Sequence, residues 1–151
     1  MHTDFYKSDT RGVSEHGWLS SRLSFSFADY YNPQRMNFGA LRVLNDDKIA
    51  AQNGFGMHEH SDMEIISIPL VGQLQHKDSI GNELIIGPND VQVMSAGSGV
   101  THSEMNPSKD VDGAFLQIWI QTREEGITPY HDHATFAPED QEGKFVTLVQ
   151  P

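Results

Sequence analysis

The chain places histidine and glutamate side chains at spacings that suit a metal site. His58 and His60 stand one residue apart, Glu64 follows them, and His102 and Glu104 repeat the one-residue spacing later in the chain. Because side chains alternate between the two faces of a strand, the members of each pair would point the same way. Three imidazoles and a carboxylate suit iron, manganese, nickel, copper or zinc, with positions left open for water or substrate.

Two other interpretations of the histidines have to be considered. In one interpretation, the same side chains bind no metal and hydrogen-bond one another on a polar rim of the fold. If they were instead buried without partners in an apolar interior, folding would carry a large desolvation penalty. A second pair, His131 and His133, lies in a polar segment beside Pro129 and Asp132 and has no apolar frame. We do not expect this second pair to bind a metal.

Short strands separated by turns would have to position these side chains. Leu23, Phe25 and Phe27 alternate with small residues, which is typical of a half-buried strand. A second strand at 41–43 is expected to end in a turn at 45–47, because Asn and Asp favour turns. Further strands are expected at 64–71, where Pro69 indicates a bulge or an edge, and at 74–78, 83–86, 91–96, 100–105 and 115–120. This pattern predicts an all-β sandwich or barrel.

The overall composition excludes several classes of function. The 151 residues fit one domain, and 21 acidic against 10 basic residues give a formal charge of −11. Binding to nucleic acid or to an anionic membrane surface is therefore not expected. There is no cysteine, so thiolate metal sites are excluded. The N-terminus has no apolar signal core, and we expect a cytoplasmic protein.

Several segments resemble a known family. GFGMHEHSDMEIISIPLVG and GSGVTHSEMN resemble the two motifs of the cupin superfamily, and HGWLSSRLSFSFADYYNP, FGALRVLNDD and QIWIQTREEGITP are similar to the bacterial branch of the pirin family. The resemblance implies a single cupin barrel, a double-stranded β-helix or jelly roll, over residues 1–127. Residues 128–151 are expected to form a loop-rich tail in which 145–149 could be one more strand.

Pirins usually contain two cupin barrels, and this chain stops where the second would begin. A naturally short member, a truncated gene product and a fragment are all compatible with that length. A single barrel would lack the cover of its second half, so a homodimer is a further expectation.

The resemblance also implies a ligand set. In pirins the ligands correspond to His58, His60, His102 and Glu104 of this chain, whereas cupins in general would use Glu64 as the carboxylate. Glu64 would otherwise lie near the site or simply end a strand. One divalent transition metal per chain is expected; Fe(II) is favoured, and Mn, Ni, Cu, Zn and Co are alternatives.

Two functions follow from the resemblance. Some bacterial pirins resemble quercetin 2,3-dioxygenases, which open a flavonol ring with dioxygen and release carbon monoxide; Glu104 would be the candidate base and Glu64 the reserve. Phe55, Met57 and Met63 could line an apolar mouth for such a small aromatic substrate. The alternative is a non-catalytic, iron-binding, redox-sensitive regulator that binds a protein partner. An inactive barrel that merely binds metal is the third possibility.

Overall fold

The chain is built almost entirely of β-strands, as its alternating pattern predicts. The computed structural model describes residues 5–150, and no helix in that range is long and apolar enough to cross a membrane. The elements are η1 (Ser8–Thr10), β1 (Gly12–Glu15), β2 (Leu19–Leu23), β3 (Leu41–Ile49), β4 (Gly54–His60), β5 (Met63–Val71), β6 (Leu74–Asp78), β7 (Glu83–Ile86), β8 (Asp90–Ser95), β9 (Val100–Met105), β10 (Gly113–Gln121), β11 (Tyr130–Thr135) and α1 (Pro138–Gln141).

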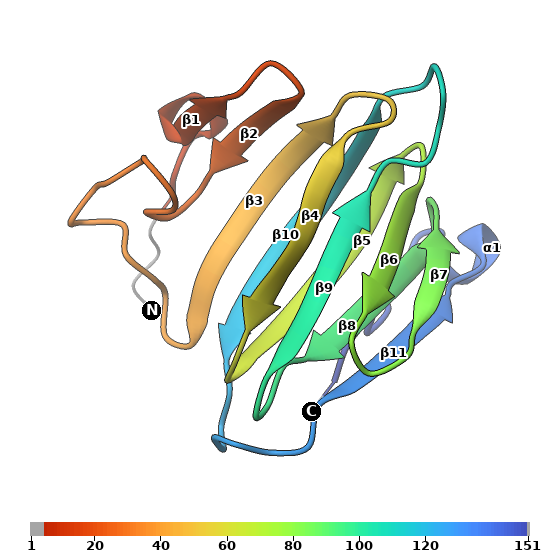
Figure 1. The fold of residues 1–151 in the computed structure, drawn as a ribbon. Helices are drawn as coiled ribbons and strands as arrows, with labels where there is room; N and C mark the ends of the chain where they lie inside the picture. The colour runs from red at the N-terminus through yellow and green to blue at the C-terminus, as the bar shows by residue number, and fades with distance from the viewer. Residues whose placement is uncertain (1–4, 151) are drawn as a thin grey trace.

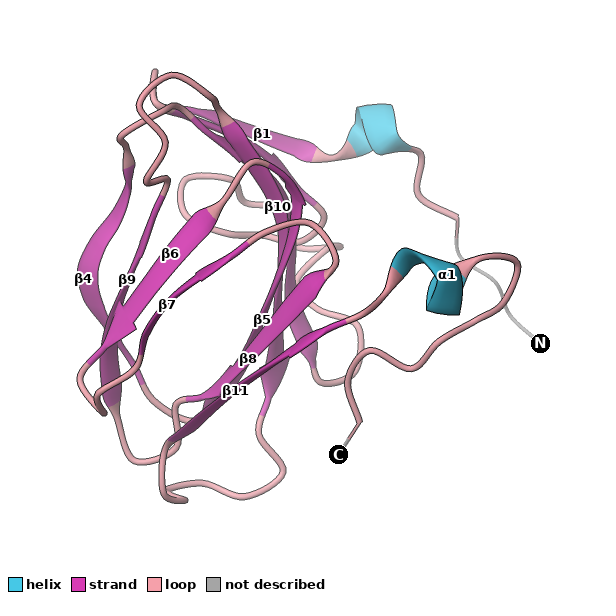
Figure 2. Ribbon diagram, turned by 90° about the vertical axis from the view of Figure 1, so that its right-hand side faces the viewer, coloured by secondary structure: helices cyan, strands magenta, loops and turns pink. Residues whose placement is uncertain are grey.

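The strands form two antiparallel sheets that lie face to face. The larger sheet has the order β1-β2-β3-β10-β5-β8-β11 and the smaller one the order β4-β9-β6-β7. Figure 1 shows the smaller sheet in front of the larger one, and Figure 2 shows the two layers from the side. Strands that follow each other in the chain, such as β3 and β4, lie in different sheets, so the chain repeatedly crosses between the layers as in a jelly roll.

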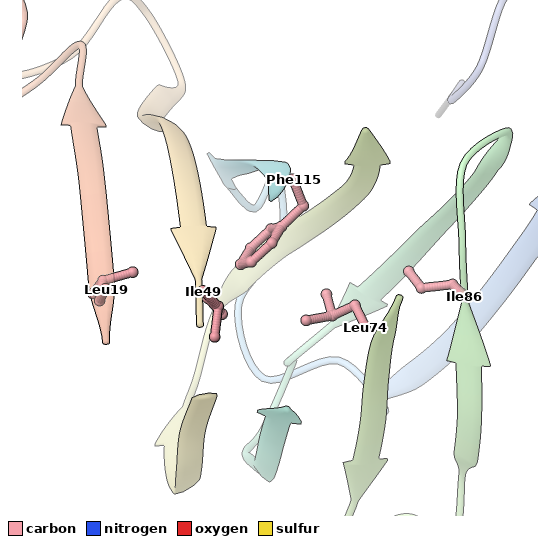
Figure 3. Packing of buried hydrophobic residues seen from close by; sticks show 5 residues of the cluster. All are labelled: Leu19, Ile49, Leu74, Ile86 and Phe115. Carbon is pink, nitrogen blue, oxygen red and sulfur yellow. The ribbon is translucent and has the colours of Figure 1, made fainter. Parts of the chain in front are cut away.

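Two apolar clusters hold the sheets together at different levels along the strands. The first cluster contains Leu19, Ile49, Leu74, Ile86 and Phe115, which Figure 3 shows projecting from both sheets into the space between them. The second contains Ile65, Met94 and Val100, with Met63 and Trp119 packed against it. Burial of these side chains is the main favourable contribution to the stability of the sandwich.

A layer of buried polar side chains lies between the two clusters. On the larger sheet, cross-strand neighbours place Asn45 beside Gln117, Gln117 beside Ser67 and Ser67 beside Gln92. We call the polar layer the buried residues Asn45, Asp47, Ser67, Gln92 and Gln117 of this sheet together with His76, Asp78, His102 and Glu104 of the smaller sheet. Polar groups in a protein interior normally require hydrogen-bond partners, so this layer is the natural place to look for function.

The N-terminal strands differ from expectation. The expected strand at 23–27 is wrong, because β2 is Leu19–Leu23 and the chain then turns, with Ala28 at a φ of 48°. The expected turn at 45–47 is also wrong, because β3 runs without interruption from Leu41 to Ile49. Asn45 and Asp47 are both only 2% exposed and point between the sheets, so alternation of burial prevailed over their turn propensity.

The C-terminal segment contains more regular structure than expected. Tyr130–Thr135 forms β11, which pairs antiparallel with β8 and extends the larger sheet. The short helix α1 follows, whereas residues 145–149 form no strand. The larger sheet therefore continues past residue 127.

Pro69 lies at a β-bulge, as its position in a strand predicts. Phe115 of β10 pairs with Pro69 and Ala114 pairs with Val71, so Leu70 is the extra residue. On the other side of β5, pairing with β8 ends at Ser67. Pro69 thus has a strand on one side only, where a residue without an amide proton is tolerated.

Candidate metal centre

Strands β4 and β9 bring the histidines of the two motifs together. His58 pairs directly with His102, and Phe55 pairs with Glu104. Two residues of β4 lie between Phe55 and His58, but only one residue of β9 lies between their partners, which makes a bulge. The bulge lets Phe55 and His58 face the same side although they are three residues apart, and it thereby directs His58 at His102.

Gly54 allows this close pairing at the start of β4. A Cβ atom at Gly54 would lie 2.2 Å from the carbonyl oxygen of Glu104 and 2.6 Å from Cα of Met105. Both are backbone atoms of β9, so a larger residue would have to push the two strands apart.

Three imidazoles converge between the strands. One ring nitrogen each from His58, His60 and His102 lie within 4.8 Å of one another, which is a separation that a single metal ion can bridge. Nε2 of His60 and both ring nitrogens of His102 are buried without a hydrogen-bond partner. Nδ1 of His58 lies 2.7 Å from the carbonyl oxygen of Gly56; if Nδ1–H donates to it, Nε2 is free to bind a metal.

The surroundings keep His60 and His102 in the form that binds metals. Burial lowers the pKa of His60 to about 4 and that of His102 to about 2, and the neighbouring histidines add to both shifts. Both rings are therefore neutral at neutral pH, and a metal ion would not have to displace a proton from either. Buried, neutral and unpartnered nitrogens are what a divalent transition metal requires, so the residues present fit such an ion.

Glu104 is buried two residues beyond His102 on β9, and its carboxylate is held on both oxygens. Ser67 Oγ donates to Oε1 at 2.7 Å, and the Gln117 amide donates to Oε2. Gln117 Oε1 in turn accepts a hydrogen bond from Trp119 Nε1. Among the described residues, the group of ligand atoms within 4.8 Å contains the three histidines without Glu104. Each carboxylate oxygen nevertheless accepts only one hydrogen bond from residues 5–150, so a lone pair remains on each.

Glu64 lies on the outer face of the larger sheet, which is turned away from the histidines. Alternation along β5 puts Glu64 opposite in direction to Ile65 and Ser67, which point between the sheets. Its Oε1 accepts a hydrogen bond from Ser95 Oγ at 2.8 Å. The structure therefore brings Glu104, and not Glu64, to the side of the sheet where the histidines lie.

Two further histidines, His76 and His131, lie next to the three that converge. His76 is fully buried; its Nε2 lies 3.0 Å from Asp78 Oδ2, and Gln92 Nε2 donates to its Nδ1 at 3.2 Å. The ring of His131 stacks on that of His76 with centroids 4.7 Å apart. The sequence left His76 unassigned, although its alternation with Asp78 was a signal that both face inward. His131 belongs to the pair that we did not expect to bind metal, and no group of three possible ligands forms around it within the described chain.

A cavity of about 450 Å³ opens beside His58 and Glu104. Its wall is partly aromatic, with Trp18, Phe27, Phe55 and Trp119, and partly polar; the polar members include Asn45, Asp47 and Gln117. The volume suits a small organic ligand. Of the residues expected at an apolar mouth, Phe55 lines this cavity, whereas Met57 is 58% exposed and Met63 packs against the second apolar cluster.

Comparison with known proteins gives consistent matches along most of the chain. The family model described as Pirin matches residues 6–120. A protein of Escherichia coli K12 named quercetin 2,3-dioxygenase is 49% identical over 130 residues, which cover 86% of this chain and 56% of that protein. A pirin-like protein of Caulobacter vibrioides is 49% identical over 141 residues, covering 93% of this chain and 60% of the relative.

A solved structure matches as well. The crystal structure of bacterial pirin YhhW from Escherichia coli in complex with nickel(II) superimposes with a TM-score of 0.84 at 44% identity, over 94% of this chain and 66% of that one. The chain thus spans less than two thirds of the length of the curated relatives named above.

Proposed function

Because this chain belongs to the pirin family and has the cupin fold, we propose that it is a metal-dependent dioxygenase that opens the ring of a flavonol such as quercetin. The observation that supports this most directly is the convergence of three imidazoles, two of them with buried ring nitrogens that have no hydrogen-bond partner, and one of them, His58, lining a cavity large enough for a small aromatic molecule. Relatives named quercetin 2,3-dioxygenase favour this substrate class.

The proposed ligands are His58, His60, His102 and Glu104, binding one divalent metal. Glu104 completes the set in this proposal because it lies inside the same layer and its carboxylate keeps free lone pairs. Fe(II) is our first choice for a reaction with dioxygen, and the nickel complex of a bacterial pirin makes nickel the first alternative.

In the proposed reaction, dioxygen and the flavonol react in equal amounts. Two bonds of the central ring break, the carbon that bore the 3-hydroxyl leaves as carbon monoxide, and both atoms of dioxygen enter the ring-opened ester. A bound metal supplies Lewis acidity that lowers the pKa of the 3-hydroxyl.

Glu104 is the proposed base that takes the proton from that hydroxyl. Ser67 and Gln117 hold its carboxylate in place, so little reorganisation is needed when the proton is transferred. Trp18, Phe55 and Trp119 would exclude water and keep the flat substrate in the cavity. Glu64 was the reserve base, and its position on the other face of β5 makes it the weaker candidate.

The regulator remains the alternative function, because the same ligands would serve an iron-binding protein that recognises a protein partner. A cytoplasmic location, a homodimer and the domain boundary at residue 127 likewise remain predictions from the sequence. The cavity beside the histidines favours the enzyme, since a regulator would not require a substrate-sized space there.

The decisive experiment loads metal-free protein with Fe(II) under anaerobic conditions, then measures oxygen uptake and carbon monoxide release with quercetin. Metal-dependent consumption of oxygen with equimolar carbon monoxide would support the dioxygenase. Stoichiometric metal binding without turnover would count against it and favour the regulator. The His102→Ala variant, loaded in the same way, controls for reaction of free iron with quercetin.

A further inference from the structure

Two buried side chains in the cavity have no role in the proposed chemistry. Asn45 and Asp47 are each 2% exposed and both line the cavity. Their Oδ1 atoms are buried and have no hydrogen-bond partner within the described part of the protein. Both side chains point between the sheets from β3, because they occupy alternate positions of that strand.

Unpartnered buried acceptors are costly, so their retention needs a reason. A site built to accept hydrogen bonds from a substrate leaves its acceptors unpaired when the substrate is absent, and it discriminates strongly against analogues that lack the donor. Two such atoms on one wall of a substrate-sized cavity have the arrangement of a site for hydroxyl donors.

The charge of Asp47 also favours binding of hydroxyl groups that donate hydrogen bonds. Burial raises the pKa of Asp47 to about 6; a hydrogen bond from Ser21 opposes the shift, and the nearby charge of Glu104 adds to it. At neutral pH most of this carboxyl is still ionised. A buried carboxylate forms a short, strong hydrogen bond with an O–H group.

Asn45 and Asp47 lie close enough to the proposed base, Glu104, for one substrate molecule to contact both. Asn45 is the cross-strand neighbour of Gln117, which donates to Glu104 (Figure 1 shows β3 beside β10). Adjacent strands are about 4.8 Å apart, so Asn45 is displaced from the residue that holds the base by about one strand spacing. A flat molecule in the cavity lined by Trp18, Phe55 and Trp119 could therefore reach Glu104 with one hydroxyl and Asn45 or Asp47 with another.

We infer that Asn45 and Asp47 are specificity residues, whose side-chain oxygens accept hydrogen bonds from substrate hydroxyls other than the one that Glu104 deprotonates. The site accordingly selects polyhydroxylated flavonols over a flavonol with a single hydroxyl. This inference rests on the proposed function, because it takes a flavonol as the ligand.

The test is anaerobic calorimetric titration of metal-loaded protein with quercetin and with 3-hydroxyflavone, which keeps only the 3-hydroxyl. The wild type is expected to bind quercetin at least tenfold more tightly than 3-hydroxyflavone. In Asp47→Asn, which removes the charge at nearly constant volume, and in Asn45→Leu, which removes the acceptor, that preference falls about fivefold or more, through weaker binding of quercetin. Asp46→Asn is the matched control, since Asp46 is the intervening residue of β3 and pairs with Arg11 at 3.2 Å instead.

The possible outcomes distinguish failure of this inference from failure of the proposed function. Metal content and thermal midpoint identify any variant that fails to fold, and the second variant then supplies the result. If both flavonols bind and neither folded variant changes their ratio, the inference is overturned, the proposed function stands, and water is what satisfies these acceptors. If the wild type binds neither flavonol, the flavonol substrate class fails, and both the proposed function and this inference fail with it.

Discussion

At the scale of single residues, His102 is the centre of the proposed site. Its ring nitrogens are both buried without partners, it lies directly opposite His58, and its ring contacts those of His60 and His76. The one-residue spacing of His58 and His60 predicts that the two share a face, because side chains alternate in a strand. That they meet His102 depends on the pairing of β4 with β9. Asn45 and Asp47 could not be predicted, since an Asn-Asp-Asp segment normally indicates a turn and only the packed sheet shows that both are buried.

The first prediction concerns the ligands. His102→Ala should lower bound metal at least tenfold, because two imidazoles and a carboxylate bind most divalent ions much more weakly than the complete set. Elemental analysis of protein purified without a tag measures this. His133→Ala should keep wild-type metal content, because His133 is exposed and outside the cluster. Equal metal content in both variants would exclude the proposed ligand set.

The second prediction separates the two glutamates. Glu104→Gln should reduce metal affinity about 10- to 100-fold and abolish turnover, because the substitution removes the charge that faces the metal and the base. Glu64→Gln should leave both unchanged, since Glu64 bonds to Ser95 on the other face of the sheet. Metal titration and oxygen uptake measure the two effects. Loss of metal from Glu64→Gln alone would instead indicate the general cupin arrangement.

The third prediction is a pH dependence of the metal-free protein. Burial lowers the pKa of His131 to about 4 from its ordinary 6.5, so below pH 6.5 the unfolded chain binds a proton that the folded protein does not. His131 therefore makes stability highest above pH 6.5 and lower as the pH falls toward 4. Because His131 is only half-buried, we expect about 1 kcal/mol between pH 7 and pH 5.

Urea denaturation of metal-free wild type and His131→Gln at several pH values checks this. The free energy of unfolding of the wild type, relative to that of His131→Gln, should fall as the pH falls. Comparing the two proteins removes the opposite contribution of Asp47, whose raised pKa lowers stability as the pH rises through about 6. Parallel pH profiles would contradict the assignment.

At the scale of elements, the bulge in β4 and the pairing of β4 with β9 set the geometry of the site. The strand limits at 83–86 and 100–105 follow from the sequence, because alternation there coincides with flanking glycine turns. The bulge between Phe55 and His58 does not, since it depends on the register with a strand more than forty residues away. Nor could β11 be predicted: its residues are mostly polar and exposed, and it forms because β8 offers a free edge.

The fourth prediction tests this pairing. Gly54→Ala should destabilise the protein by about 1–3 kcal/mol and weaken metal binding, because the added Cβ meets backbone atoms of β9 that cannot move independently of His102. Gly56→Ala is the matched control in the same strand, since a Cβ there meets nothing within 4 Å. Urea denaturation and metal titration of both variants measure the effects. Equal behaviour of the two would show that β4 can separate from β9 without affecting the site.

At the scale of the whole molecule, metal binding and folding are coupled through the polar layer. The layer lies between the two sheets, and two of its members, His102 and Glu104, are proposed ligands. An ion that binds only the folded protein stabilises it by mass action. Removal of the metal should therefore lower the free energy of unfolding of the whole domain and not only empty the site.

The fifth prediction follows from this coupling. At a free metal concentration 100 times the dissociation constant, binding should contribute about 2.7 kcal/mol, which corresponds to a rise in thermal midpoint of about 5–10 °C for a domain of this size. Thermal denaturation with metal and with excess chelator measures the shift. His102→Ala should show a clearly smaller shift at the same metal concentration, and a chelator effect of equal size in that variant would point to metal binding elsewhere.

The separation of the two apolar clusters has a consequence for how this protein can change over evolutionary time. Ile49 and Phe115 lie on one side of the polar layer and Ile65 and Met94 on the other, and none of these four lines the cavity, although Leu19 of the first cluster does. Most of the residues that hold the sheets together are therefore not those that would contact a ligand. Replacements within the cavity wall at Asn45, Asp47 or Gln117 would leave both clusters intact. A sandwich of this kind can acquire new ligand preferences by single substitutions while the greater part of its folding energy is retained.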